Sequence, residues 1–324
     1  MPMSIKTADG LDKNLILDIV EVAKQGAIGA SKMRGCGDEK EADKYAVDAM
    51  RSALNKINMD GTIVIGEGER DEAPMLYIGE KVGTGHGQAI DIALDPLEGT
   101  TLCAKNQPNS LAVIAMAKKG NLLYAPDVYM QKIAVGPGYA KNIIDINAPL
   151  SDNIIKLAMA KAVHPQELTI CIMDRPRHAA LIKEARQTGA RIRLITDGDI
   201  AAVIETASSD ITGTDLYVGI GGAPEGVLAS AAMRCLGGQI FGKLILDTEE
   251  KRNRAATMGI TDPQKIYTVE EMAAGDVLFA ATGVTNGNML SGVKITKDYI
   301  KTETLLMQSS TRTIQTIKAK DYLS

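Results

Sequence analysis

The 324-residue chain lacks several features that mark common classes of protein. It has no Trp and only two Phe, which argues against a surface that stacks nucleic-acid bases. Its formal net charge is −4 and it has no basic tail, so nothing favours binding to a nucleic-acid backbone. It also has no run of about 18 uninterrupted apolar residues, the length that a membrane-spanning helix needs. We therefore expect neither a nucleic-acid partner nor a membrane.

Residues that form disulfides and zinc sites are equally sparse. The four cysteines, at 36, 103, 171 and 235, show no Cys-x-x-Cys spacing, and the three histidines are scattered. This pattern predicts reduced thiols rather than a disulfide framework, and it disfavours a zinc site of His and Cys. Since the N-terminus also lacks the apolar segment of a signal peptide, the sequence predicts a cytoplasmic protein.

The apolar pattern changes near residue 150 and predicts an α/β protein with an α+β half. Residues 11–33 and 39–57 have the apolar spacing of helices, and short β-rich runs follow them. Later in the chain, strands and helices alternate, which predicts a parallel sheet. We therefore expect two domains: an α+β domain at 1–150 and an α/β domain at 151–324.

Individual elements follow from the same patterns. The turn at 118–121 predicts a hairpin between two strands, and the alternating segment 302–318 predicts a strand that rejoins either sheet. Helices are expected at 177–187, 199–206 and 224–236. Strands are expected at 62–65, 89–94, 110–117, 121–125, 132–135, 168–173, 191–195 and 216–220.

The most informative motif is Asp-Pro-Leu-Glu-Gly-Thr at 95–100, where the run 89–94 predicts that a strand ends. Carboxylate oxygens are the ligands that Mg²⁺ and Mn²⁺ prefer. Gly99 allows a ligand to approach the backbone closely, and N–H groups that open a following helix receive anions. The alternative is a strand-to-helix turn whose acids only stabilise the helix dipole.

Three more acids are candidates, each with a plainer interpretation beside it. Asp43 lies on an apolar helical stripe, where a carboxylate is costly unless it is paired, or else at the edge of that stripe near the helix start. Glu67, like its neighbour Glu69, follows an apolar run and glycines, so a carboxylate aimed by a sharp turn competes with an exposed hairpin tip. Glu225 lies in a Gly-rich turn between a predicted strand and helix, as a site acid or a first-turn Glu.

Together these positions predict a metal-binding cluster. Carboxylates gathered in one pocket repel each other unless cations hold them together. Two hard metal ions would do so, and would clamp the attacking and leaving oxygens of a phosphoryl transfer. The five acids of this predicted cluster are Asp43, Glu67, Asp95, Glu98 and Glu225.

Polar residues at other predicted strand ends suit a sugar phosphate. Arg175 and Arg177 flank Pro176 and form a plausible phosphate clamp, because guanidinium groups match phosphate oxygens; solvated surface arginines are the alternative. The Asp-Gly-Asp run at 197–199 offers acceptors for sugar hydroxyls, or simply an N-cap for the next helix. Tyr129 suits contact with a sugar phosphate or a buried structural role.

With these residues in view, the chain from about residue 15 to its end closely resembles the class II, glpX-type fructose-1,6-bisphosphatases. These belong to the lithium-sensitive sugar and inositol phosphatase superfamily, whose members share mainly an Asp-Pro-x-Asp/Glu-Gly-Thr/Ser element. The other matching runs are more particular to this branch. They are Asp-Gly-Thr-Ile-Val-Ile-Gly-Glu-Gly-Glu at 60–69, Asp-Glu-Ala-Pro-Met-Leu-Tyr-Ile-Gly at 71–79 and Gly-Ile-Gly-Gly-Ala-Pro-Glu-Gly at 219–226.

The resemblance implies a layered α/β/α/β sandwich with its site between the two domains, and a homo-oligomer such as a dimer or tetramer. It implies Mn²⁺ or Mg²⁺ on the five acids named above, and a sugar bisphosphate as the small-molecule substrate. It also implies substrate contacts at Glu98, Gly99, Thr100, Tyr129, Arg175, Pro176, Arg177, Asp197, Gly198, Asp199 and Gly222.

The expected reaction is removal of the 1-phosphate of fructose 1,6-bisphosphate in gluconeogenesis, with sedoheptulose 1,7-bisphosphate as a further substrate of some relatives. Thr100, with Glu67 or Glu69, is expected to position the attacking water and take its proton. Competing hypotheses are a phosphatase for inositol phosphates or nucleotide bisphosphates, and a non-catalytic sugar-phosphate sensor.

Two positions depart from the family pattern. The family usually has Gly-Asp-Lys-Asn before the helix acid, whereas here Gly-Asp-Glu-Lys at 37–40 places the lysine one position later, at Lys40. The family role of that lysine is therefore not carried over. Arg175 is a Lys in some relatives, a change that keeps the charge but not the fork geometry.

Overall fold

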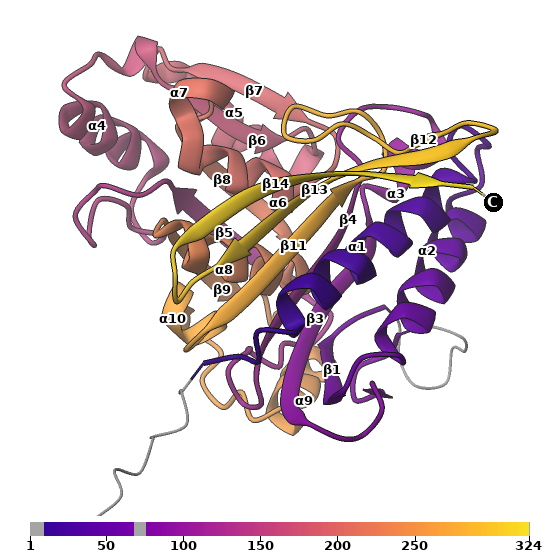
Figure 1. Ribbon diagram of the computed structural model, residues 1–324. Coiled ribbons are helices and arrows are strands. Elements are labelled where there is room, and N and C mark those ends of the chain that lie inside the picture. Colours follow the sequence, from indigo (N-terminus) through magenta and orange to yellow (C-terminus); the bar gives the residue numbers. More distant parts are fainter. Residues whose placement is uncertain (1–9, 68–75, 324) are drawn as a thin grey trace, which may run out of the picture.

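The computed structural model describes residues 10–67 and 76–323, and it consists of two β-sheets interleaved with helices (Figure 1). The predicted mixed α/β class is confirmed. Within the described ranges, no helix combines the length and the apolar character that crossing a bilayer requires.

Over the described residues, the first sheet has eight strands and holds both the early strands and the C-terminal ones. β1 and β3 are parallel, and the other paired neighbours are antiparallel. The segment predicted to rejoin one of the sheets joins this one, as part of the β13–β14 hairpin. The spatial order is β12 (Lys294–Ile295), β13 (Tyr299–Gln308), β11 (Val277–Gly283), β4 (Leu111–Lys118), β3 (Gln88–Glu98), β1 (Met59–Ile65) and β2 (Lys81–Val82), with β14 (Thr313–Tyr322) paired to β13.

The second sheet has six strands within the part of the chain that the structure describes. β6 is parallel to both β7 and β8, as the alternation of strands and helices predicts. β5 and β9 run antiparallel to their neighbours, so the sheet is mixed rather than purely parallel. The order is β10 (Ile266–Tyr267), β9 (Gln239–Leu244), β5 (Tyr129–Val135), β8 (Leu216–Gly222), β6 (Thr169–Met173) and β7 (Arg191–Ile195).

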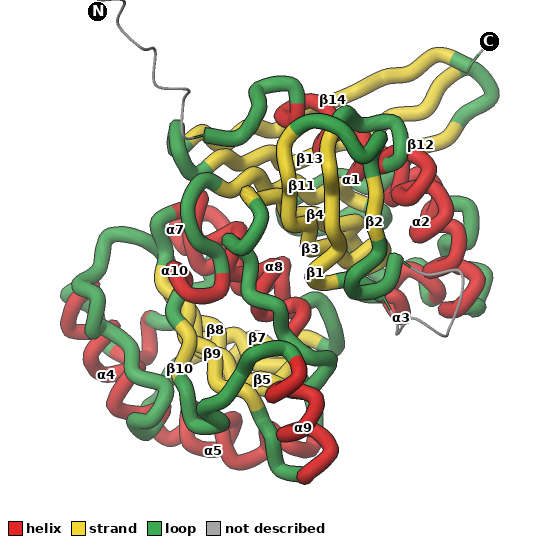
Figure 2. The backbone as a smooth tube through the Cα atoms, turned by 90° about the horizontal axis from the view of Figure 1, so that it is seen from below, coloured by secondary structure: helices red, strands yellow, loops and turns green. Residues whose placement is uncertain are grey.

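Helices cover the outer face of each sheet and fill the space between them (Figures 1 and 2). α1 (Leu15–Ser31) and α2 (Glu39–Leu54) share a core with one face of the first sheet. α6 (Asp199–Glu205) and α8 (Ala223–Leu236) share a core with the inner faces of both sheets. The predicted α/β/α/β layers are present, and α4 (Leu150–Lys161) with α5 (Ala179–Gln187) adds a fifth layer outside the second sheet.

Shorter helices lie in the connections. They are α3 (Thr100–Ala104), α7 (Ser209–Thr212), α9 (Glu249–Thr257) and α10 (Val269–Met272), with 3-10 turns η1 (Pro165–Glu167), η2 (Pro176–His178) and η3 (Thr206–Ser208).

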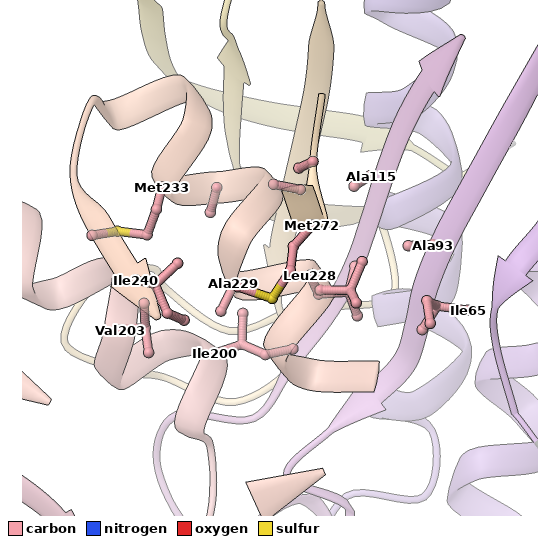
Figure 3. Close-up of a cluster of buried hydrophobic side chains, with 14 of the residues drawn as sticks. Ile65, Ala93, Ala115, Ile200, Val203, Leu228, Ala229, Met233, Ile240 and Met272 are labelled. Atoms are coloured by element: carbon pink, nitrogen blue, oxygen red, sulfur yellow. The ribbon is translucent and has the colours of Figure 1, made fainter. Parts of the chain in front are cut away.

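α8 forms the centre of the inner core. Most residues of this helix are themselves small or apolar and are buried, as expected for a helix that lies between two layers. In Figure 3, Leu228 and Ala229 of this helix lie among Ile200 of α6, Ala93 of β3 and Met272 of α10. This packing fixes the N-terminal turn of α8, which carries Glu225.

The hairpin predicted around residues 118–121 is wrong. β4 pairs with β3 and β11 instead, and residues 121–125 form no strand beyond a single bridge between Leu122 and Ala273. The Asp91 carboxylate accepts hydrogen bonds from the N–H groups of Gly120 (2.6 Å) and Leu122 (3.5 Å). These bonds hold the chain in a turn, after which it crosses to the second sheet.

The division into domains at residue 150 stays a prediction, but the sheets do not divide the chain there. β5 precedes residue 150 and belongs to the second sheet. β11 to β14 follow residue 150 and return to the first sheet. The halves are therefore interlocked by exchanged strands, a feature that a linear scan of patterns does not detect.

The contact between α1 and α2 positions Asp43, which lies on α2 among buried Ala42 and Ala46. Gly29 of α1 lets the two backbones approach closely. A methyl group there would lie 2.3 Å from the carbonyl oxygen of Tyr45 and 3.0 Å from Cβ of Ala49.

We predict that Gly29→Ala lowers the free energy of unfolding by about 2 kcal/mol, although Ala ordinarily favours a helix interior by up to about 1 kcal/mol. The added methyl group must push the helices apart because it meets backbone atoms. Urea unfolding measures the change, and Ser52→Ala at an exposed position of α2 is the matched control, with an expected effect within about 0.5 kcal/mol. A stabilised Gly29→Ala protein would contradict the close packing.

Candidate active site

β3 brings Asp95 and Glu98 to one end of the first sheet. The sequence predicts that this strand ends at residue 94, but it continues to Glu98. Its pairing register with β4 shifts between Asp95 and Glu98. Pro96 is tolerated because it lies within this irregularity, where a ladder N–H is not needed. The Oδ1 atom of Asp95 accepts a hydrogen bond from the N–H of Leu97 (3.0 Å), which holds the local turn.

Gly99 then turns the chain from β3 into α3. Its φ is 75°, in the left-handed region that favours glycine. Thr100 follows as the first residue of α3, and its hydroxyl donates to the carbonyl oxygen of Leu97 (3.0 Å). The proton of this hydroxyl is thereby used within the chain, which leaves the oxygen lone pairs available as acceptors.

Burial raises the pKa of the carboxyls in this region. The pKa values of Asp95 and Glu98 lie well above their ordinary values, first because both groups are buried and then because other acids lie near them. Burial, followed by the charges of Asp43 and Glu225, raises the pKa of Glu67 to about 8. Burial raises the pKa of Asp43 to about 6.

Glu225 approaches the same region from the first turn of α8. Burial raises its pKa, the charge of Asp199 adds to that shift, and the charge of Lys132 opposes it. Its Oε2 atom is buried and has no hydrogen-bond partner within the described part of the chain. Gly222 makes room for it, since a Cβ there would lie 1.9 Å from this oxygen.

The five predicted acids therefore lie close enough to interact. The charge of Asp43 raises the pKa of Glu67. The charges of Glu98, Glu67 and Glu225 raise the pKa of Asp95. As the side chains stand in residues 10–67 and 76–323, however, no three or more His, Cys, Asp or Glu groups are arranged to hold a metal ion. Metal ligation by these acids remains a prediction, and Glu69 lies outside the described residues.

Predicted substrate contacts gather at one edge of the second sheet. Arg177 follows β6, Asp197 follows β7, and Tyr129 begins β5 opposite Gly222 at the end of β8. The guanidinium of Arg177 lies 4.8 Å from the centre of the Tyr129 ring and donates twice to the carbonyl oxygen of Ile220 (3.0 and 2.8 Å).

The Asp-Gly-Asp run completes this edge. Burial raises the pKa of Asp197, and the nearby charge of Arg175 opposes the shift. Gly198 has a φ of 85°, so it turns the chain into α6 in a conformation that suits glycine. Asp199 begins α6 and is buried, and the next N–H, that of Ile200, donates to Oε1 of Glu98 (3.1 Å). The two halves of the predicted site thus meet at Glu98.

Pro176 begins the turn η2 beside these groups, and buried His178 ends it. The Nε2 atom of His178 accepts from the N–H of Ile220 (2.8 Å), and Nδ1 contacts the carbonyl oxygen of Met173 (2.8 Å). An acceptor Nε2 means that Nδ1 carries the proton. Burial lowers the pKa of this histidine, which therefore serves as a neutral link between β6 and β8.

Sequence reasoning missed two charged residues. Lys132 of β5 is 1% exposed, forms an ion pair with Asp199 and donates to the carbonyl oxygen of Gly222 (2.9 Å). One available signal was a single charged residue inside the largely apolar strand Tyr129–Val135. Asp127 is exposed, but its charge contributes to the raised pKa of both Glu67 and Glu225.

Comparison with known proteins now identifies the class. A family model described as "Bacterial fructose-1,6-bisphosphatase, glpX-encoded" matches residues 13–321. The chain belongs to this family, which confirms the resemblance found in its motifs and makes it a phosphatase. A requirement for a divalent metal ion is consistent with membership of this family.

Two relatives from Synechococcus agree with the family match. One protein from Synechococcus sp. (strain CC9902) is 48% identical over 96% of this chain and 98% of its own length, and is named D-fructose 1,6-bisphosphatase class 2/sedoheptulose 1,7-bisphosphatase. A protein of the same name from Synechococcus sp. (strain RCC307) is 46% identical over 96% of this chain and 97% of its own length. Among solved structures, extragenic suppressor protein suhB from Bartonella henselae has a TM-score of 0.41 and 13% identity over 71% of this chain and 86% of its own.

We predict that Glu67 makes the protein less stable as the pH rises from about 4.5 to about 8 when a chelator removes divalent cations. Its carboxyl ionises near 4.5 in the unfolded chain but only near 8 in the folded protein, so the folded state binds more protons between these values. The unfolding temperatures of wild type and Glu67→Gln, measured at pH 6 and pH 8, isolate this contribution. Wild type should lose more stability than the variant between the two pH values, and identical slopes would show that Glu67 ionises normally.

Proposed function

We propose that this protein hydrolyses the 1-phosphate of fructose 1,6-bisphosphate to give fructose 6-phosphate, as in gluconeogenesis, and that it also accepts sedoheptulose 1,7-bisphosphate. The observation that carries the proposal is the meeting, at Glu98, of a buried cluster of acids and an edge lined by arginines, a tyrosine and carboxylates. The acid cluster suits a metal-assisted attack on a phosphate group. The edge of the second sheet, with its arginines, suits a sugar that carries a further phosphate. Family membership and the names of the relatives support the same substrate.

We further propose Mn²⁺ or Mg²⁺ as the cofactor, held by Asp43, Glu67, Asp95, Glu98 and Glu225. The donor set fits because it consists of carboxylate oxygens. It also fits because Oε2 of Glu225 is a buried acceptor that has no hydrogen-bond partner among the described residues and could accept a cation. When bound, the ion supplies positive charge that activates water and offsets the charge of the phosphate oxygens. Among the residues that the structure describes, no three acids stand in a coordinating arrangement, so binding by this set requires some of these side chains to turn.

The chain's own groups then orient the reaction. The hydroxyl of Thr100 donates a hydrogen bond to the carbonyl oxygen of Leu97, so its oxygen accepts one from the attacking water. Glu67 takes the proton that the water loses. Glu69 is an alternative acceptor. N–H groups from Gly99 to Thr101 receive phosphate oxygens. As the water oxygen bonds to phosphorus, the bond to the sugar oxygen breaks, and that oxygen leaves with the electron pair and gains a proton from solvent.

Groups of the second sheet bind the remainder of the substrate. Arg175, Pro176 and Arg177, with Tyr129, hold the remote phosphate, whose binding energy helps to position the reacting end. The segment from Asp197 to Asp199 and the backbone at Gly222 receive sugar hydroxyls. Because Arg177 is already anchored on the Ile220 carbonyl, its fork is prepared before the substrate arrives.

A cytoplasmic location and a homo-oligomer of two or four chains also remain proposals. The cysteines Cys36, Cys103, Cys171 and Cys235 are free, and all but Cys36 are buried, which suits a reducing compartment.

A phosphate-release panel tests the function. With Mn²⁺ or Mg²⁺ present, kcat/KM should be greatest for fructose 1,6-bisphosphate, with sedoheptulose 1,7-bisphosphate next, and a chelator should abolish turnover until metal is restored. Greater activity on an inositol monophosphate or a bisphosphorylated nucleotide would replace the proposed substrate. Tight binding of the sugar bisphosphate without turnover would instead indicate a sensor.

We predict that Thr100→Ala lowers kcat by a factor of about 10²–10³ while Mn²⁺ affinity changes little, because the hydroxyl orients water and lies outside the proposed ligand set. Thr100→Ser keeps the hydroxyl and is the matched control, expected to retain most activity. Steady-state kinetics and titration with Mn²⁺ measure the two effects. Wild-type turnover in Thr100→Ala would remove this residue from the mechanism.

A further inference from the structure

Lys132 is a buried cation at the junction of the two substrate-contact segments. Its Nζ atom forms an ion pair with Oδ2 of Asp199 on α6 and donates to the carbonyl oxygen of Gly222 at the end of β8 (2.9 Å). A lysine side chain that is 1% exposed is costly unless its charge and donors are satisfied. The two contacts therefore bind together segments that lie far apart in the sequence.

Neighbouring residues are shaped around this pair. The hydroxyl of Tyr217 donates to the same Oδ2 atom of Asp199 (3.3 Å). Gly221 leaves the space that the pair occupies, since a Cβ there would lie 2.4 Å from this oxygen and 3.0 Å from Nζ of Lys132. Asp199 thus has one oxygen held by two donors.

The other oxygen of Asp199 has a different environment. Within the part of the chain that the structure describes, Oδ1 accepts no hydrogen bond. Asp199 also begins α6, whose next N–H contacts Glu98. Fixing Asp199 through Oδ2 therefore leaves Oδ1 available to a ligand at a defined place beside the acid cluster.

We propose that Lys132 is a positioning residue for substrate selection: it anchors Asp199 through Oδ2 and holds the Gly222 carbonyl, so that Oδ1 of Asp199 receives a sugar hydroxyl. The inference rests on the proposed function and deepens it, because it separates recognition of the sugar from recognition of the phosphates. Lys132 does not itself contact the substrate in this scheme. Its replacement should weaken binding of ligands with sugar hydroxyls and should spare ligands that have only a phosphate.

The test compares two products of the proposed reaction as ligands of the Mn²⁺-loaded protein. Lys132→Met keeps an unbranched side chain, one atom shorter, and removes the charge. In this variant the dissociation constant of fructose 6-phosphate should rise by about tenfold or more. That of inorganic phosphate should change by less than about twofold. Isothermal titration measures both, and thermal unfolding checks that the variant is folded.

Lys161→Met is the matched control. Lys161, the last residue of α4, also forms an ion pair with a largely buried carboxylate, Asp215. Asp215 directly precedes β8, at the opposite end of that strand from Gly222. The control variant should leave both dissociation constants unchanged even if it lowers stability. If Lys132 has a merely structural role, its variant should bind fructose 6-phosphate and phosphate more weakly by the same factor. That outcome overturns the proposal, and so does an unchanged affinity for both ligands.

Tyr217→Phe keeps the inference testable if Lys132→Met does not fold. This change removes only the second hydrogen-bond donor to Oδ2. It should raise the dissociation constant of fructose 6-phosphate by about two- to fivefold and leave that of phosphate unchanged. Wild-type affinity for fructose 6-phosphate in that variant contradicts the anchoring of Asp199. If the wild-type protein neither binds fructose 6-phosphate nor hydrolyses the bisphosphate, the proposed function itself has failed.

Discussion

Mutual repulsion among buried carboxylates is the constraint on which the rest of this structure depends. Removing acids from water and placing them near one another raises the pKa of each, as at Asp95, Glu98 and Glu67. Such an arrangement does not stabilise the chain, so the surrounding fold must hold it. In residues 10–67 and 76–323, three apolar cores provide that support, one on the outer face of each sheet and one between the sheets.

The repelling acids are held by separate helices and strands rather than by one segment. Asp43 comes from an outer helix, Asp95 and Glu98 from β3, and Glu225 from the helix between the sheets. Each element is fixed by its own buried face, so no single loop must keep all the charges together. The inner helix α8 shares a core with both sheets (Figure 3). Its first turn carries Glu225, so this packing also places one of the acids.

Much of this arrangement could be predicted from the sequence, because local patterns carry local information. Helical spacing located α1 and α2, and the Asp-Pro-Leu-Glu-Gly-Thr motif located two of the interacting acids. Strand pairing was harder, since a turn such as that at residue 120 is compatible with a hairpin until the Asp91 carboxylate is seen to hold it. The exchange of β5 and β11–β14 between halves depends on long-range packing that periodicity does not record.

The same distinction explains why acids were found and Lys132 was not. An acid beside glycines at a strand end has the appearance of a site, whereas a lysine inside a strand is easily taken for a solvent-facing residue of an alternating pattern. In β5 the neighbours of Lys132 on both sides of the chain are largely buried, so no solvent-facing side is available to it. A charge that cannot reach water is costly unless it is paired with an opposite charge and hydrogen-bonded. A single charged residue in such a strand therefore predicts a second, opposite charge elsewhere, and here that charge is Asp199 at the centre of the predicted substrate contacts.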